Sequence, residues 1–430
     1  MGCPPGILVR RVIGAIVLGA VLIGCAASRP TVSGPATVPA EVDSPKGVAI
    51  PAAGSPAHDG GHQTPSGPDE SRTRGSEFTR VIMGVQARIR IVSPIERTDS
   101  PSDADPPALP PDHALAPDRT RARGSAREAS PDPGPTTSPL AAAAAAFGRM
   151  ADLESVISDY RVDSDVTRVA ESAGGPPVVV SPAMVAATHT ALGWARRTGG
   201  AFDPTVGPAT QRWRAMRNGA AAPSADEQQS IRALVDFRRV DVNARDATVR
   251  LPVAGMRLDF GGIGKGMAAD AALAELRERG ARSALVSVAG DVAAGDPPPG
   301  AAGWRVIAGR DGEVEPARLI IANQAISTSG DTGQYVEIDG QRYAHIVDPR
   351  TGIGARARRA VSVLSPTATT ADALASAIFV LGDGPLTRAL VAGEPGTAVR
   401  IHDAEAAGPR TVIIDPHGAW ADAVRRASDS

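Results

Sequence analysis

Apolar and polar residues alternate along residues 78–92, and a repeat of two is typical of a half-buried β-strand. Six apolar residues of this range lie at alternate positions: Val81, Met83, Val85, Ala87, Ile89 and Ile91. Residues 153–160 follow a longer repeat, with apolar residues at i, i+3, i+4 and i+7: Leu153, Val156, Ile157 and Tyr160. This spacing places them on one face of an amphipathic helix. We therefore expect one strand over 78–92 and one helix over 153–160.

Helix and strand signals are interspersed along the rest of the chain. Ser181-Pro182 is typical of a helix start, Gly280 ends a helix predicted over 265–279, and Thr370 precedes one predicted over 371–381. Short strands are predicted over four ranges: 256–260, 284–288, 304–308 and 319–322. Asp339-Gly340 predicts a hairpin between 335–338 and 342–347. Because these elements do not repeat as βαβ units, we expect an α+β fold.

The N-terminal residues have the pattern of an export signal. Arg10 and Arg11 precede an apolar run over residues 12–23, which is too short to span a bilayer comfortably. The run ends in Leu22-Ile23-Gly24-Cys25, which resembles a bacterial lipobox, although an ordinary signal peptide with a chance cysteine has the same pattern. We expect a lipoprotein signal peptide over 1–24 and a lipid anchor at Cys25. The anchor would hold an exported protein at the outer face of the inner membrane or in the periplasm.

Composition divides the remaining chain. Residues 25–75 are rich in Pro, Gly, Ser and Ala without periodicity, which predicts a disordered tether. A similar composition returns at about 93–139, where we expect a disordered insertion. The insertion would interrupt a single domain that spans 76–430.

Charge and cysteine content exclude two classes of function. The formal net charge is -2 and aromatic residues make up 3% of the chain, so the sequence lacks the basic excess and the stacking platforms of a nucleic-acid-binding protein. Cys3 and Cys25 are the only cysteines, and removal of the signal would leave one, already lipidated. The exported domain is therefore expected to contain neither a disulfide nor a thiol site.

A glycine-rich loop carries one of only two lysines in the chain, Lys265; the other is Lys46. The loop joins a predicted strand to a predicted helix, a place where backbone N–H groups can approach an anion. A Walker A loop is excluded because Gly266, not Ser or Thr, follows the lysine. A variant dinucleotide-binding loop and a tight turn with a solvated lysine both remain open.

Five segments together resemble one known family. They occur in this order: Gly199–Trp213, Leu258–Asp270, Val286–Gly295, Ala325–Gly352 and Ala371–Gly382. In this set the chain resembles the FAD:protein FMN transferases, the ApbE-type flavin transferases, from about Val81 to Gly382 and beyond. The resemblance implies mixed, largely antiparallel sheets with packed helices, in an ApbE-like, T-fold-like catalytic domain of two lobes. It also implies Mg²⁺-dependent transfer of FMN from FAD to a threonine or serine hydroxyl of a target protein, with release of AMP.

The resemblance assigns a metal site and a base. Asp372 and Ser376 stand four residues apart, hence on one helical face, and would ligate Mg²⁺ together with the backbone carbonyl of Gly264. Mn²⁺ would suit the same ligands. Without the resemblance, Asp372 would be read as a charge that complements a helix dipole. His345 matches the catalytic base, and Lys265 would hold the pyrophosphate loop or support the metal-binding carbonyl.

The same resemblance implies the residues that contact FAD: Met83, Tyr160, Ala201, Phe202, Asp203, Gly261, Gly262, Lys265, Asp291, Ser329 and Gly330. The sequence departs from the family pattern at Val85, Ala289 and Ser376, where threonine, glycine and threonine are usual. These departures leave two alternatives open, an FAD pyrophosphatase that yields FMN and AMP and a non-catalytic flavin-binding lipoprotein. For a transferase, the expected partner is an acceptor protein with a flavinylation motif, typically a membrane redox protein.

Overall fold

The computed structural model describes residues 73–94, 138–309, 316–330, 335–338, 340–405 and 408–429. The predicted signal peptide, Cys25 and most of the predicted tether and insertion lie outside the described residues. Within those ranges, no helix combines the length and the apolar character that a bilayer span requires.

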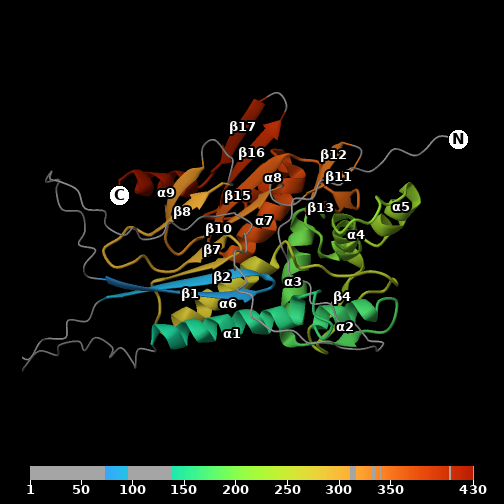
Figure 1. The fold of residues 1–430 in the computed structure, drawn as a ribbon, viewed down its shortest axis with the longest axis horizontal. Helices are drawn as coiled ribbons and strands as arrows, with labels where there is room; N and C mark the ends of the chain where they lie inside the picture. The colour runs from blue at the N-terminus through green and yellow to red at the C-terminus, as the bar shows by residue number, and fades with distance from the viewer. Residues whose placement is uncertain are drawn as a thin grey trace, which may run out of the picture.

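The centre of the fold is an eight-stranded sheet in which every neighbouring pair is antiparallel (Figure 1). Its strands lie in this order: β1 (Thr73–Ile82), β2 (Val85–Pro94), β6 (Ala284–Val288), β7 (Asp291–Ala294), β10 (Ala325–Gly330), β15 (Arg359–Ser365), β16 (Ala398–Glu405) and β17 (Gly408–Ile414). The predicted α+β class with largely antiparallel sheets is confirmed.

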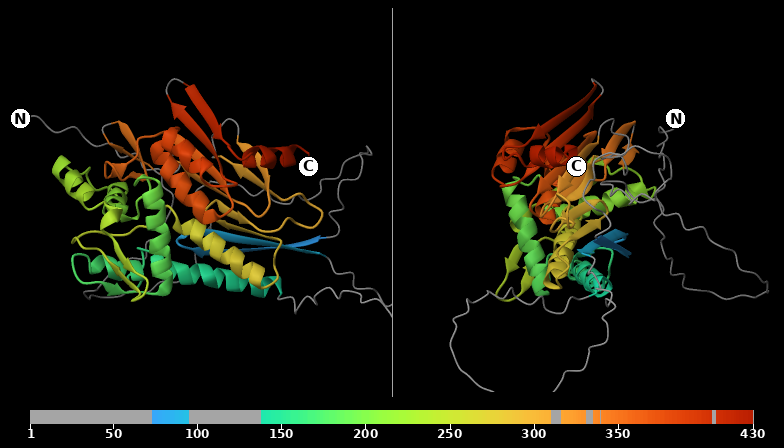
Figure 2. Two further views of the ribbon diagram at one scale, coloured as in Figure 1. Left: turned by 180° about the vertical axis from the view of Figure 1, so that it is seen from behind. Right: turned by 90° about the vertical axis from the view of Figure 1, so that its left-hand side faces the viewer.

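Both faces of this sheet are covered. Helices α1 (Pro139–Ile157), α6 (Gly264–Glu278) and α7 (Ala368–Leu381) form a layer on one face (Figure 2). The hairpin of β8 (Trp304–Ala308) and β9 (Ala317–Ile321) packs with α9 (Ala419–Ser428) on the other. In β6, Val286 faces the helices and its neighbour Leu285 faces the hairpin, so the strand is buried along its full length. This explains why β6 is apolar at every position except Ser287.

Helices α6 and α7 approach each other closely because a glycine lies at their contact. A Cβ atom added to Gly266 would lie 2.3 Å from the carbonyl oxygen of Ala368, well inside van der Waals contact. Asp270 of α6 accepts hydrogen bonds from the backbone N–H groups of Ala368 and Thr369, each at 2.8 Å. In return, Asp372 of α7 accepts one from the N–H of Gly266 at 3.1 Å. Each helix thus supplies a carboxylate to the N-terminal turn of the other.

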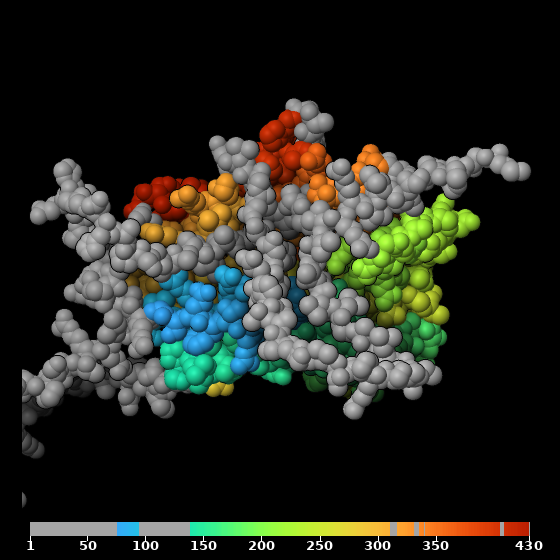
Figure 3. All heavy atoms as spheres, in the orientation of Figure 1, coloured from blue at the N-terminus to red at the C-terminus, as the bar shows by residue number. Residues whose placement is uncertain are grey.

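The alternating range 78–92 is a hairpin rather than the single strand predicted. Met83 and Gly84 have φ angles of +56° and +69°, typical of a type I′ turn, and Ile82 pairs with Val85 across it. Val81 is therefore 77% exposed, whereas Ile82 is buried. The hairpin lies on the surface beside α1 (Figure 3). Its strands begin inside the range predicted as a tether and end inside the range predicted as an insertion.

A second tight turn of the same kind joins β6 to β7. Ala289 and Gly290 have φ angles of +50° and +95°, and Val288 pairs with Asp291. Ala289 N–H donates to Gln86 O at 3.0 Å, so both turns lie at the same end of the sheet. Alanine in this left-handed conformation is strained, and glycine, which the family prefers here, is not.

Replacement of Ala289 by glycine should therefore raise the free energy of unfolding by about 1 kcal/mol, with part of the gain offset by the greater freedom of glycine in the unfolded chain. Urea unfolding of the two proteins measures the difference. Ala293→Gly is the matched control, because Ala293 lies buried in β7 with no positive φ and its substitution should destabilise. A lower stability for Ala289→Gly would contradict this account.

The remaining elements lie together beside the large sheet, with α3 and α4 among them (Figure 1). They are α2 (Asp165–Glu171), α3 (Pro182–Arg197), η2 (Pro204–Val206), α4 (Gly207–Arg217), α5 (Ala225–Ala233), η3 (Phe237–Arg239) and α8 (Pro385–Ala392), with a small sheet of β3 (Val178–Val179), β5 (Thr248–Arg250) and β4 (Asp241–Asn243). Two hairpins complete them: β11 (Tyr335–Ile338) with β12 (Gln341–Ala344), and β13 (Val347–Asp348) with β14 (Ile353–Gly354).

Three predicted elements differ from the structure. Residues 256–260 form no strand: Met256, Leu258 and Phe260 are buried, which explains the alternation, but Asp259 N–H donates to the carbonyl of Pro204 in η2 at 2.7 Å. The helix predicted over 153–160 is the end of α1, which stops at Ile157. Helix α7 begins three residues earlier than predicted, because the side chain of Thr367, not Thr370, caps it.

Candidate active site around the glycine-rich loop

The glycine-rich loop is shaped by Asp259 and by the start of α6. Oδ1 of Asp259 accepts a hydrogen bond from the N–H of Gly261 at 2.6 Å, and the N–H of Gly264 donates to Phe260 O at 2.7 Å. Gly262 faces α7, where a Cβ atom would lie 2.9 Å from the hydroxyl oxygen of Ser376. Glycine at this position therefore lets the loop approach α7, and it brings Gly262 and Ser376 together.

Lys265 lies between two buried carboxylates. Its Nζ is 2.9 and 3.1 Å from the two oxygens of Asp372 and 3.1 Å from Oδ2 of Asp291, and it donates to Gly261 O at 3.3 Å. The side chains of Asp372 and Asp291 are 1% and 3% exposed. Oδ1 of Asp291 also accepts from the hydroxyl of Ser327 at 2.6 Å. The interpretation of Lys265 as a solvated lysine is therefore wrong, and we call Lys265, Asp291 and Asp372 the charge cluster.

The charge cluster shifts the pKa of its members. Burial alone would lower the pKa of Lys265, but the charges of Asp291 and Asp372 outweigh burial and raise it above its usual range. Burial, followed by the charge of Asp372, raises the pKa of Asp291 to about 7, although Lys265 opposes the shift. With both carboxylates ionised, the cluster carries two negative charges and one positive charge.

This arrangement makes stability depend on pH. A carboxyl group whose pKa is raised in the folded state binds its proton more tightly there than in the unfolded chain, so its stabilising effect is complete below the unfolded pKa of ~3.9 and is lost as pH rises to about 7. In metal-free buffer, wild type should therefore lose stability relative to Asp291→Asn as pH rises from 4 to 7, by at most about 1.4 kcal/mol per pH unit. Urea unfolding of both proteins across this range measures the difference. A difference that does not change with pH would contradict the raised pKa.

The same residues fit a hard divalent cation. Oδ1 of Asp372 accepts one bond, from Lys265, and so keeps lone-pair capacity, and Ser376 lies one helical turn further along α7. The excess negative charge of the cluster would favour a cation, and oxygen donors suit Mg²⁺. Across the described residues, no group of three or more His, Cys, Asp or Glu side chains forms a metal cage. A cation here would therefore depend on backbone, hydroxyl, water and substrate oxygens as well.

Helix α4 contacts both the loop and the predicted base His345. Oδ2 of Asp259 accepts from the hydroxyl of Thr210 at 2.6 Å and lies 3.5 Å from Nη2 of Arg214. On the same helix, the ring of Trp213 meets His345 edge-on, with centroids 6.2 Å apart at 62°. His345 follows β12, so the β11–β12 hairpin places it against α4. The sequence analysis named neither these α4 residues nor Asp259 as site residues. A signal existed for Asp259, which lies in the segment Leu258–Asp270, and for Thr210 and Trp213, which lie in Gly199–Trp213, but not for Arg214.

Three residues predicted to contact FAD are buried instead in the protein. Ala201, Phe202 and Asp203 are each at most 6% exposed. Asp203 accepts hydrogen bonds from the N–H and hydroxyl of Thr205 at 2.8 and 2.6 Å and from Phe237 N–H at 3.2 Å. Burial raises its pKa. These contacts show a structural role for Asp203, and a contact of the three residues with FAD stays a prediction.

Other predicted contacts gather at the turn end of the sheet. Met83 occupies one of the two tight turns there. Ser329 lies two residues beyond Ser327 on the same face of β10, with Gly330 at the end of the strand. Tyr160 lies apart from them, just after α1, and is 75% exposed. Its ring lies beneath the guanidinium of Arg214, whose Cζ is 4.4 Å from the ring centroid.

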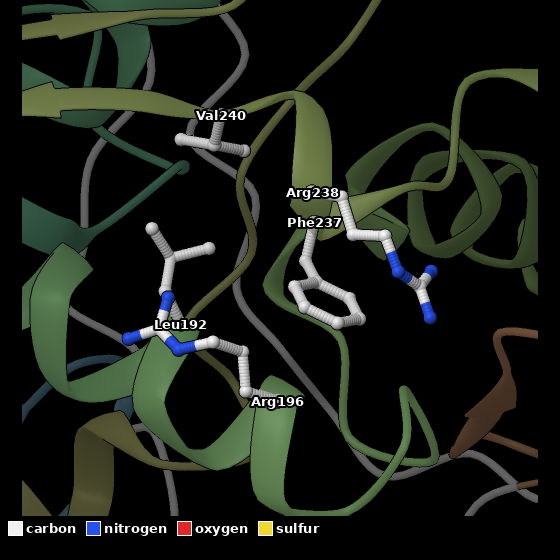
Figure 4. Close-up of a pocket in the computed structure, with 5 residues that line it drawn as sticks. All are labelled: Leu192, Arg196, Phe237, Arg238 and Val240. Atoms are coloured by element: carbon white, nitrogen blue, oxygen red, sulfur yellow. The ribbon is translucent and has the colours of Figure 1, made fainter.

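A separate surface hollow lies beside α3. It is lined by Leu192 and Arg196 of α3 and by Phe237, Arg238 and Val240 at η3 (Figure 4). None of the predicted site residues lines this hollow. It is therefore not part of the site around the glycine-rich loop.

The chain is similar to known proteins over much of its length. The chain matches the model of the ApbE family over residues 121–400. It is 36% identical over 253 residues to FAD:protein FMN transferase of Treponema pallidum, covering 55% of this chain and 70% of the relative. It is 29% identical over 237 residues to FAD:protein FMN transferase of Escherichia coli K12, covering 53% and 68%.

Solved structures show the same architecture. The apo flavinyl transferase ApbE of Pseudomonas stutzeri aligns with a TM-score of 0.64 at 24% identity, covering 83% of this chain and 99% of that one. The flavin transferase ApbE of Vibrio cholerae aligns with a TM-score of 0.63 at 20% identity, covering 82% and 99%. At these identities, the likeness shows the fold alone.

Proposed function

The chain belongs to the ApbE family, and from this premise we propose how its site carries FMN from FAD to a target protein. The chain is an FAD:protein FMN transferase, as its relatives are named. We propose in addition that the acceptor is a threonine or serine hydroxyl and that AMP leaves.

The observation that carries this proposal is the charge cluster at the start of α6. The glycine-rich loop ends at the N-terminus of a helix, where backbone N–H groups favour an anion. Lys265 adds a cation that is 29% exposed, so it can meet a ligand while Asp291 and Asp372 hold it. We therefore place the pyrophosphate of FAD against Gly261, Gly262 and Lys265. Asp291 orients Lys265 through their ion pair, and the Ser327 hydroxyl orients Asp291 by donating a hydrogen bond to it.

We propose that Asp372, Ser376 and the carbonyl of Gly264 hold Mg²⁺, with Mn²⁺ as a substitute. When bound, the cation would neutralise negative charge on the pyrophosphate oxygens. The chain's own contribution is to hold the Asp372 carboxylate in place, because Lys265 and the N–H of Gly266 both donate hydrogen bonds to it. Serine replaces the family's usual threonine at 376 and keeps the hydroxyl ligand.

The transfer itself is a phosphoryl substitution. The acceptor hydroxyl oxygen forms a bond to the phosphorus of the FMN half, the P–O bond to the AMP phosphate breaks, and AMP keeps the bridging oxygen. The hydroxyl proton passes to His345, because a neutral imidazole can accept a proton near pH 7. Trp213 and the β11–β12 hairpin hold the histidine ring in place.

We further propose an exported protein anchored through a lipid on Cys25, with a membrane redox protein as the acceptor. The support is the lipobox pattern of residues 22–25, the length of sequence between Cys25 and β1, and the protein acceptor implied by the names of the relatives. This tether would let the domain reach an acceptor held at the same membrane.

Incubation with FAD, Mg²⁺ and a purified acceptor domain that carries a flavinylation motif tests the function. Covalent flavin fluorescence on the acceptor, with one AMP released per FMN attached, is the expected result. Free FMN and AMP without labelling would show an FAD pyrophosphatase, and intact bound FAD would show a flavin-binding protein. Mutation of the acceptor threonine to alanine in the motif is the control that should abolish labelling.

A further inference from the structure

One arginine joins the exposed Tyr160 to the glycine-rich loop. Arg214 of α4 pairs through Nη1 with Asp159, its Nη2 lies 3.5 Å from Oδ2 of Asp259, and its Cζ lies 4.4 Å from the centre of the Tyr160 ring. The side chains of Arg214, Asp159 and Asp259 are 28%, 16% and 8% exposed. Three different partners therefore use one planar guanidinium.

The contacts hold Tyr160 in place without burying it. The tyrosine is 75% exposed, yet the guanidinium covers one face of its ring, a cation–π geometry. Two carboxylates fix the guanidinium in turn, and its rigid fork suits two partners better than a lysine would. An aromatic ring that is held on one face and open on the other is a platform on which a planar ligand can stack.

The other end of the arrangement reaches the loop. Asp259 binds Arg214 and Thr210 through Oδ2 and the N–H of Gly261 through Oδ1. A shift of Arg214 would therefore move both the platform and the loop. The proposed function places the pyrophosphate of FAD against this loop, and Tyr160 is one of the residues that the sequence predicts to contact FAD.

We infer that Arg214 is a positioning residue that sets the distance between the ring-stacking face of Tyr160 and the pyrophosphate loop, and so selects a nucleotide that carries a flavin ring. This inference rests on the proposed function, because it takes FAD as the ligand. Arg214 touches neither reacting atoms nor metal ligands, and it acts through Tyr160 and Asp259.

Ligand binding tests the inference with two probes, FAD and ADP, since ADP has a pyrophosphate and adenosine but no flavin ring. Arg214→Gln should weaken FAD binding roughly 10-fold and ADP binding less than about 2-fold, the scale of a stacking contact. The FAD affinity of Arg214→Lys should lie between those of wild type and Arg214→Gln, because lysine keeps the charge but lacks the forked guanidinium. Arg212→Gln is the matched control, since Arg212 of the same helix pairs with Glu227 at 2.6 Å and does not contact the platform. It should bind both probes as wild type does.

A double-mutant cycle decides whether Arg214 acts through Tyr160. In a Tyr160→Ala background, Arg214→Gln should cause little further loss of FAD affinity. An undiminished further loss of FAD affinity, or equal losses for FAD and ADP, would overturn the inference.

Arg214→Gln leaves the carboxylates of Asp159 and Asp259 facing each other. If this variant does not fold, the double variant Asp159→Asn with Arg214→Gln relieves that repulsion, and the same selective loss of FAD affinity is expected. Wild type that binds FAD but transfers no FMN would refute the proposed function alone.

Discussion

Replacement of Asp372 by asparagine is expected to abolish cation-dependent FMN transfer while the protein keeps its fold. An amide preserves the shape of the side chain and one acceptor oxygen, but it lacks the negative charge that a hard cation requires. We expect the rate of FMN transfer to fall at least about 100-fold, which is the usual effect of removing one charge-stabilising group from an active site. The measurement is the initial rate of acceptor labelling against Mg²⁺ concentration, with calorimetric titration of Mg²⁺ in parallel.

The same substitution should change a second observable. Because the charge of Asp372 helps to raise the pKa of Asp291, its removal should lower that pKa and weaken the pH dependence of stability described above. Asp383→Asn is the control: Asp383 lies just beyond α7 and pairs with Arg388 at 2.7 Å, away from the charge cluster. Near-normal Mg²⁺-dependent turnover in Asp372→Asn would remove Asp372 from the site.

His345→Ala should bind FAD and Mg²⁺ almost as wild type does but transfer FMN about 10²–10⁴-fold more slowly, the usual effect of losing a general base. The defect should shrink as pH rises, because hydroxide partly replaces the missing base. Transfer rate at saturating FAD and FAD affinity, each measured from pH 6 to 9, provide the comparison.

A purely structural histidine would behave differently. Its loss would loosen the contact with Trp213 and lower FAD affinity or thermal stability, with no recovery at high pH. Trp213→Phe is the matched variant, because it keeps an aromatic partner for the ring and should retain the pH dependence of wild type. Weakened FAD binding with an unchanged saturated rate in His345→Ala would show that His345 is not the base.

The sequence predicted the parts of the site that lie in short contiguous segments. The loop around Lys265 and the pair Asp372 and Ser376 are local patterns, and the structure brings them together through α6 and α7. The α+β class followed from the order of elements. The hairpin at Met83 was missed because its two-residue turn carries apolar Met83, which continues the alternation of the strand.

The contacts between distant segments could not be predicted in this way. Asp291 was expected to contact FAD, but its partner Lys265 was not expected. The two meet because β7 leaves its turn with the Asp291 side chain toward the helices. Residues 256–260 alternate as a strand does, but their hydrogen-bond partner is the backbone before α4, about 50 positions away in the sequence. Arg214 had no local pattern at all, since each of its partners comes from another segment.

The exchange of carboxylates between α6 and α7 links the site to the folding of the whole domain. The partners Lys265 and Asp372 are 107 positions apart, with β6, β7, β10 and β15 between them, so no fragment that ends before α7 contains the charge cluster. A ligand of this cluster therefore binds the native chain and not the unfolded one, and each tenfold rise in its concentration above saturation adds about 1.4 kcal/mol to the free energy of unfolding. Substrate supply thereby becomes a determinant of how long the protein survives proteolysis, independently of how fast it turns over.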